Sequence, residues 1–159
     1  MSDDWAKKFV EDHNQEQLGK QQKDQEAQAR RRLAEDGARE KFHQIRERID
    51  QDIQILRGAV AFHSLELDKS LEGKLTVLHR GDPRVELTVN LNVTTIVCEY
   101  TFSPKEPGRA RKEPKTLRIC SDLDGVITVS ENGKGKTFAY DSEVSEFLLQ
   151  PLIHYVTSL

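Results

Sequence analysis

One apolar stripe constrains the fold of this chain more than any other feature of the sequence. Its members follow one another at intervals of three or four residues, which places them on one face of a helix: Ala38, Phe42, Ile45, Ile49, Ile53, Leu56 and Val60. Continued towards the N-terminus, the pattern meets Glu35 and Arg31, so the buried face is predicted to begin near Ala38. Asp52 occupies a position that a coiled coil would fill with an apolar residue. We therefore expect the stripe to pack on a sheet.

Residues 1–37, upstream of the stripe, are predicted to form a solvated helical arm. From Asn14 to Asp36 the sequence is rich in glutamine and in oppositely charged pairs four residues apart, and it offers no apolar stripe. Gly19 and Gly37 each disfavour a helix by about 1 kcal/mol relative to alanine, so we expect hinges or ends there. Because a helix without tertiary packing is marginally stable in water, the arm is interpreted as partly frayed.

The arm begins with a short amphipathic segment, SDDWAKKFVEDH. Trp5 and Phe9 are four residues apart on one helical face, and Val10 lies beside them. Burying a large apolar side chain contributes roughly 1.5 to 3 kcal/mol, and tryptophan is enriched among interface hot spots. Trp5, Phe9 and Val10 are therefore the predicted partner-binding residues. The alternative is an exposed aromatic pair on a frayed terminus.

Residues 71–141 have the alternation of short β-strands. The clearest run, VELTVNLNV, places every second residue from Val85 to Val93 on one apolar face. The next run, TTIVCEYTF, is out of phase with it, which predicts a bulge or a tight turn between Asn92 and Thr95. The connections between these runs are short, so neighbouring strands are expected to be antiparallel. Residues 59–68 are compatible with a last helical turn or with a short strand.

The C-terminal segment from Asp141 or Ser142 onwards is predicted to be a helix, which Pro151 kinks or divides in two. Strands in succession between two amphipathic helices predict an α+β fold. In this fold, an antiparallel sheet of about five or six strands is covered on one face by the stripe helix and the C-terminal helix. The predicted division is an arm at 1–37 and an α+β domain at 38–159.

The stretch CSDLDGVITVS, residues 120–130, contains the one candidate catalytic motif. It is similar to the first motif of the haloacid-dehalogenase-like phosphotransferases, and this resemblance implies Asp122 as nucleophile and Asp124 as general acid/base. The family resemblance also implies a doubly wound fold with further catalytic residues on later strands. Only 35 residues follow Asp124, and they contain hairpin signals and one helix. Because Asp124 and Gly125 suit a tight hairpin turn, a turn is the interpretation we favour.

No other set of residues predicts a reaction, and no catalytic residue is assigned. The five histidines are scattered without metal-ligand spacing, so neither a metal site nor a cofactor is expected. Cys98 is in phase with apolar Ile96 and is interpreted as a small core residue. With Cys120 it makes only two cysteines, too few for a disulfide framework.

Residues 103–118, SPKEPGRARKEPKTLR, are predicted to form an exposed cationic loop, because three prolines and a glycine oppose regular structure. Its cations are suited to phosphate groups or to an acidic protein surface. The candidate anion-contacting or nucleic-acid-contacting residues are Lys105, Arg109, Arg111, Lys112 and Lys115. The alternative is a solvated loop without a ligand.

Charge and hydropathy narrow the classes of function. With 24 basic and 27 acidic residues, no overall field attracts the chain to nucleic acid or to a membrane. Neither a signal-like segment nor a long apolar run is present, so a cytoplasmic location without membrane contact is expected. We expect a non-enzymatic interaction or assembly domain, adaptor-like or chaperone-like, that binds a protein partner or self-associates through the arm. Weak nucleic-acid binding through residues 103–118 is the alternative.

Overall fold

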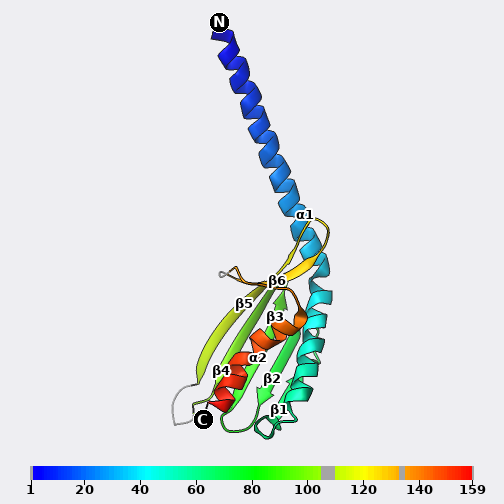
Figure 1. The fold of residues 1–159 in the computed structure, drawn as a ribbon, viewed down its shortest axis with the longest axis vertical. Helices are drawn as coiled ribbons and strands as arrows, with labels where there is room; N and C mark the ends of the chain where they lie inside the picture. The colour runs from blue at the N-terminus through cyan, green and yellow to red at the C-terminus, as the bar shows by residue number, and fades with distance from the viewer. Residues whose placement is uncertain (1, 105–109, 133–134, 159) are drawn as a thin grey trace.

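A single helix makes up the first third of the molecule. The computed structural model describes residues 2–104, 110–132 and 135–158, and α1 (Ser2–Leu56) runs through the first 55 of these without interruption. At 1.5 Å per residue it is about 80 Å long. Figure 1 shows its N-terminal half projecting far beyond the rest of the molecule. Gly19 and Gly37, where hinges or ends were expected, both lie inside the helix.

Seven strands form one antiparallel sheet in which each strand pairs with the next in sequence. They are β1 (Leu65–Asp68), β2 (Lys74–His79), β3 (Val85–Asn92), β4 (Thr95–Phe102), β5 (Arg111–Ser121), β6 (Ile127–Glu131) and β7 (Thr137–Phe138). The α+β class and the antiparallel sheet are confirmed, and the strands outnumber the five or six predicted. A 3-10 turn, η1 (Val60–Phe62), precedes β1, so residues 59–68 contain both a helical turn and a strand.

The phase change between β3 and β4 is produced by a tight turn. Asn92 pairs with Thr95, which leaves Val93 and Thr94 as a two-residue hairpin connection. Val93 has φ 56°, a left-handed conformation that is uncommon for a β-branched residue. The turn therefore exposes Val93 and reverses the pleat, so that the apolar residues of both strands face the same side of the sheet.

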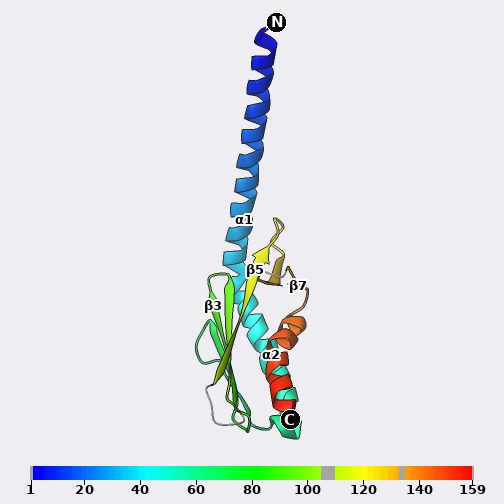
Figure 2. The ribbon, with the colours of Figure 1, turned by 90° about the vertical axis from the view of Figure 1, so that its left-hand side faces the viewer.

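Two helices cover one face of the sheet. The C-terminal half of α1 and α2 (Asp141–Thr157) lie side by side on this face, and Figures 1 and 2 show the opposite face uncovered. The uncovered face carries polar pairs such as Thr88 with Glu99. Although Pro151 removes one backbone N–H, α2 continues through it as one helix that begins at Asp141.

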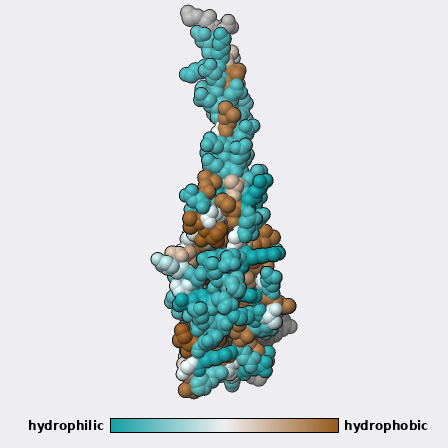
Figure 3. Space-filling view, turned by 90° about the vertical axis from the view of Figure 1, so that its right-hand side faces the viewer, coloured by the Kyte–Doolittle hydropathy of each residue, from teal (hydrophilic) through white to brown (hydrophobic). Residues whose placement is uncertain are grey.

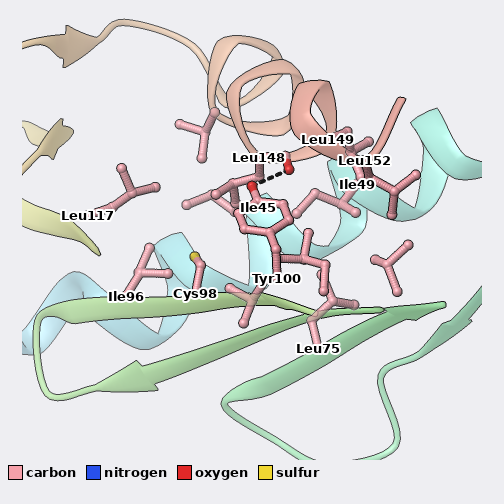
Figure 4. Packing of buried hydrophobic residues seen from close by; sticks show 14 of the residues in the cluster. Ile45, Ile49, Leu75, Ile96, Cys98, Tyr100, Leu117, Leu148, Leu149 and Leu152 are labelled. Atoms are coloured by element: carbon pink, nitrogen blue, oxygen red, sulfur yellow. Dashed lines mark hydrogen bonds between the residues drawn. The ribbon is translucent and has the colours of Figure 1, made fainter. Parts of the chain in front are cut away.

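The hydrophobic core fills the space between the sheet and the two helices. Its largest fully buried side chains include Ile45, Ile49, Ile53, Leu75, Ile96, Tyr100, Leu117, Leu148 and Leu152. Figure 4 shows Tyr100 pointing from β4 towards α2, where its hydroxyl donates a hydrogen bond to the Leu148 carbonyl. This bond satisfies the polar end of a side chain that is otherwise surrounded by apolar groups.

Polar contacts fix α1 against α2. Ser145 donates a hydrogen bond from its hydroxyl to a carboxylate oxygen of Asp52 at 2.6 Å, and the Lys41 ammonium lies 2.7 Å from the Asp141 carboxylate. Asp52 is the residue whose charge argued against a coiled coil. The structure pairs it with a hydroxyl of the neighbouring helix, which explains a carboxylate beside the apolar stripe.

Burial along α1 begins at Ala34, one turn before the predicted position at Ala38. Strands β5 and β6 contact α1, and Ile127, the first residue of β6, packs against the helix at Gly37. A Cβ atom at Gly37 would lie 2.9 Å from Ile127 Cδ1, so this glycine permits a close approach and does not end the helix. We call residues 4–33 the free segment, none of which is buried, and residues 34–56 the docked segment.

The basic segment is more regular than expected. Residues 111–118 form the first part of β5 and pair with β4, so the prediction that the prolines keep them irregular is wrong. The partner on the other side, β6, pairs only with Leu117–Ser121. Among the described residues, Pro114 therefore has a strand neighbour on one side only, and edge positions are where a strand accepts proline.

Candidate protein-interaction site

The N-terminal tip of the free segment presents large apolar side chains to solvent. Trp5 is 68% exposed, Phe9 63% and Val10 55%, which are unusually high values for side chains of this size. The His13 ring stacks on Phe9, with 5.9 Å between the ring centroids and an interplanar angle of 6°. The predicted partner-binding residues thus form one exposed cluster, to which His13 adds a fourth member.

This tip lies on the same side of α1 as the stripe that packs on the sheet. His13 precedes Ile49 by thirty-six residues, which is about ten turns of an α-helix. His13 and Ile49 therefore point in the same direction about the helix axis. Phe9 is rotated from that direction by about 40° and Trp5 by about 80°. One helical face is therefore apolar at both ends of α1, but only the C-terminal end is covered by the sheet.

A groove lies at the base of the free segment. Its volume is about 450 Å³, and its walls are α1, the turn between β3 and β4, and the last residues of β5. Ala27, Ala34 and Ile119 supply apolar lining, and Arg30, Arg31 and Arg118 supply positive charge. Figure 3 shows hydrophobic surface gathered at this level of the molecule, below the polar middle of the helix.

The three arginines of the groove are free to bind another molecule. Within residues 2–104, 110–132 and 135–158, none of their side chains forms a hydrogen bond, an ion pair or a cation–π contact. Glu35 is the one acidic residue that lines the groove. Leu123 and Val126, in the loop between β5 and β6, add half-exposed apolar surface to this end of the domain. The base of α1 thus combines unpaired positive charge with accessible apolar groups.

A larger hollow, of about 820 Å³, lies on the other flank of the docked segment. Its lining mixes both charges, with Glu35, Glu40 and Glu72 beside Arg39 and Arg46. Because Arg46 donates hydrogen bonds to the carbonyls of Leu71 and Lys74, at 2.9 and 3.3 Å, it holds the loop before β2 in place. This hollow does not select a ligand of one charge.

The candidate cations of the basic segment that the structure describes, Arg111, Lys112 and Lys115, do not converge on one site. Lys105 and Arg109 lie outside the described residues. Arg111 and Lys115 point to the helix side of β5, where Arg111 lies over the Phe102 ring at 4.8 Å and Lys115 over the Phe147 ring at 4.2 Å. Lys112 points to the opposite face, 3.6 Å from the Glu99 carboxylate.

The DLDG stretch forms the connection between β5 and β6. Asp122 Oδ1 accepts hydrogen bonds from the backbone N–H groups of Asp124 and Val126, both at 2.9 Å. Gly125 has φ 84°, a conformation that favours glycine. The predicted turn is confirmed, and Asp122 and Asp124, the two residues singled out by the phosphotransferase resemblance, both lie in this hairpin connection.

The buried thiol of Cys98 is part of the hydrophobic core. Burial raises the pKa of the Cys98 thiol to about 12, so this side chain is a protonated core residue at neutral pH. Across the described ranges, no group of three or more histidine, cysteine or acidic side chains is arranged to hold a metal ion. Nor does any helix in this part of the chain combine the length and hydropathy needed to span a membrane.

Comparison with known proteins gives no family for this chain: no family model matches it, and no curated protein or solved structure is significantly similar. The candidate site is therefore defined only by the geometry of this chain. Sequence reasoning found the exposed tip but missed the groove, because Arg118 joins Arg30 and Arg31 only through the packing of β5 against α1. The run ARRR, residues 29–32, was the one local sequence feature that indicated positive charge at this position.

Proposed function

We propose that the protein is a non-enzymatic interaction or assembly module that binds a protein through the tip of its helical arm. The observation that carries this proposal is the exposure of Trp5, Phe9 and Val10 at the end of a helix whose next twenty residues bury nothing. Hiding these side chains from water is favourable, and the molecule itself offers them no cover.

The architecture supports presentation of this tip. The docked segment anchors α1 through a buried stripe and through contacts of Asp52 and Lys41 with α2. Because α1 is continuous, the anchored end directs the free segment away from the domain, as Figure 2 shows. The tip is thereby held far from the domain surface, where a partner can reach it from several sides.

Weak nucleic-acid binding through residues 103–118 remains the less favoured proposal. Three cations of that segment, Arg111, Lys112 and Lys115, already contact Phe102, Glu99 and Phe147, and they are divided between two faces of β5. A phosphate backbone is contacted best by several cations on one surface. Binding to nucleic acid that disappears with moderate salt would be the sign of this function.

Affinity purification from the native host tests the proposed function. Quantitative comparison of the full chain with a variant carrying Trp5→Ala and Phe9→Ala should show specific partners lost from the variant. The matched control is Val60→Ala with Leu71→Ala, which removes two exposed apolar side chains from the domain and should retain the same partners. If both variants retain all partners equally, the tip is not the binding element.

A further inference from the structure

We propose that the groove at the base of α1 receives the Trp5–Phe9 tip of a second copy of the chain. In this arrangement two free segments lie antiparallel about a two-fold axis, and each tip docks at the base of the other. The inference rests on the proposed function, because it names the protein that the tip binds. Such an isologous interface uses the same two surfaces twice.

The occupant of the groove has to come from another molecule. Trp5 and the groove residue Arg31 are parts of one continuous helix. At 1.5 Å per residue, about 40 Å separates them along the helix axis. Within one molecule the tip cannot reach the groove unless the helix breaks between the two, whereas the tip of an antiparallel second copy meets the groove without any break.

One register of the antiparallel pair matches side chains throughout the free segment. When Trp5 of one copy faces Arg31 of the other, Phe9 falls opposite Ala27 and Glu16 opposite Lys20. An indole beside a guanidinium is a favourable cation–π pair. A large ring facing alanine lets two helices approach closely, and Glu16 with Lys20 is an opposite-charge pair. By symmetry each of these contacts is made twice.

All of these side chains lie on the helical face that continues into the buried stripe. From Trp5 to Ile53, positions 5, 9, 13, 16, 20, 23, 27, 31, 34, 38, 42, 45, 49 and 53 follow at intervals of three or four residues. The face is polar in its middle, from His13 to Lys23, and again at Arg31. When the charged middle residues of two antiparallel helices pair with each other, each helix also covers the apolar end of the other free segment.

Charge favours the same arrangement. The tip carries the acidic residue Asp4 at its start, and the groove carries Arg30, Arg31 and Arg118 without partners in the described chain. Antiparallel pairing brings the acidic start of one copy to the level of these arginines in the other. A parallel pair would instead align the acidic starts with each other and leave both groups of arginines unpaired.

Sedimentation velocity over a range of protein concentrations tests the dimer. The full chain should be dimeric, and Trp5→Ala with Phe9→Ala should raise the dissociation constant at least tenfold, or about 1.4 kcal/mol. Arg31→Glu should also weaken the dimer. The matched control is Leu18→Ala, which removes an exposed apolar side chain from the opposite side of the free segment and should leave the dissociation constant unchanged.

Disulfide trapping tests the orientation. In the proposed register, residue 13 of one copy lies opposite residue 23 of the other. Chains carrying His13→Cys should therefore form a disulfide with chains carrying Lys23→Cys when the two are mixed and oxidised, and mass spectrometry should identify the joined peptides. Either variant oxidised alone should give no such link, because its two introduced thiols would be about 15 Å apart along the axis.

Three outcomes would overturn the inference: a chain that is monomeric at every concentration, self-linking of each single-cysteine variant as in a parallel pair, or a dimer unaffected by the double tip variant. They are distinguishable from failure of the proposed function. If the chain is monomeric but the double tip variant loses a partner from the native host, the arm is a binding element for a different protein. If the dimer is confirmed, both proposals stand together.

Discussion

The two segments of α1 share one helix but have opposite relations to the rest of the molecule. The docked segment, residues 34–56, buries Ile45, Ile49 and Ile53 completely, whereas no residue of the free segment, residues 4–33, is buried. Both segments have apolar groups on the same face. The comparison teaches that a helical face becomes core only where the chain supplies a surface to cover it, and the uncovered face of the free segment is the one for which we propose a second molecule.

The largest expected difference between the two segments is in the effect of an introduced carboxylate on the free energy of unfolding. Ile49→Asp should lower the free energy of unfolding by at least about 3 kcal/mol, because it buries an unpaired charge and leaves a cavity. Leu18→Asp, at an exposed position, should change it by no more than about 0.5 kcal/mol. Urea unfolding followed by circular dichroism measures both, and equal midpoints for the two variants would refute the assignment of the core.

The sequence was most informative where burial follows a simple period. The stripe correctly predicted burial from Ala38 to Ile53 and the alternation of β3 correctly predicted burial from Val85 to Val89, because side-chain direction repeats every 3.6 residues in a helix and every two in a strand. At the ends of the two patterns the prediction was wrong, since Val60 and Val93 are exposed. The phase change at Asn92–Thr95 likewise predicted a bulge or a tight turn, and the structure contains the turn. These are local properties, and local sequence determines them.

Features that depend on distant contacts could not be predicted in this way. Gly37 was expected to be a hinge or an end of the helix because its intrinsic propensity is poor, but contact with Ile127 at the start of β6 determines its role. Pro114 was assigned to a loop, although a strand accepts proline where it has only one neighbour. The groove arginines come from two elements 87 residues apart, since Arg31 and Arg118 meet only in the folded chain.

Alanine substitutions at the two helical glycines sharpen the comparison. Gly19 has no atom near its missing Cβ, so Gly19→Ala should favour helix in the free segment by up to about 1 kcal/mol without changing the urea midpoint of the domain. At Gly37 the same gain should be offset by contact with Ile127 Cδ1 and Cγ1, at 2.9 and 3.1 Å from the added carbon. Circular dichroism at low protein concentration and urea midpoints measure the two effects.

A second substitution isolates the steric part at Gly37. Ile127→Val removes the Cδ1 atom, so the double variant with Gly37→Ala should be more stable than the sum of the two single effects predicts. Strict additivity, or a full gain of about 1 kcal/mol from Gly37→Ala alone, would show that Ile127 does not constrain this position.

The smallest expected effect concerns charge. In the docked segment Glu47 and Asp50 each lie 2.8 Å from the Lys69 ammonium, which joins α1 to the loop after β1. Hydrogen bonding to Lys69 holds the pKa of both carboxyl groups below their usual values, and the pKa of Lys69 is raised by the same contacts. The free segment, by contrast, forms no ion pair among its described residues.

Acid titration of stability distinguishes the two segments. Because the carboxyl pKa values are lowered on folding, the contribution of Lys69 should be complete above the unfolded-state pKa of about 4 and should disappear as pH falls through the folded-state values. Lys69→Met should therefore lower the urea midpoint at pH 7 and have progressively less effect towards pH 2. Lys20→Met, on the free segment, should have no effect on the domain midpoint at either pH. A loss of stability in Lys69→Met that is constant with pH would mean that packing of its aliphatic chain, and not the ion pairs, holds α1 to this loop.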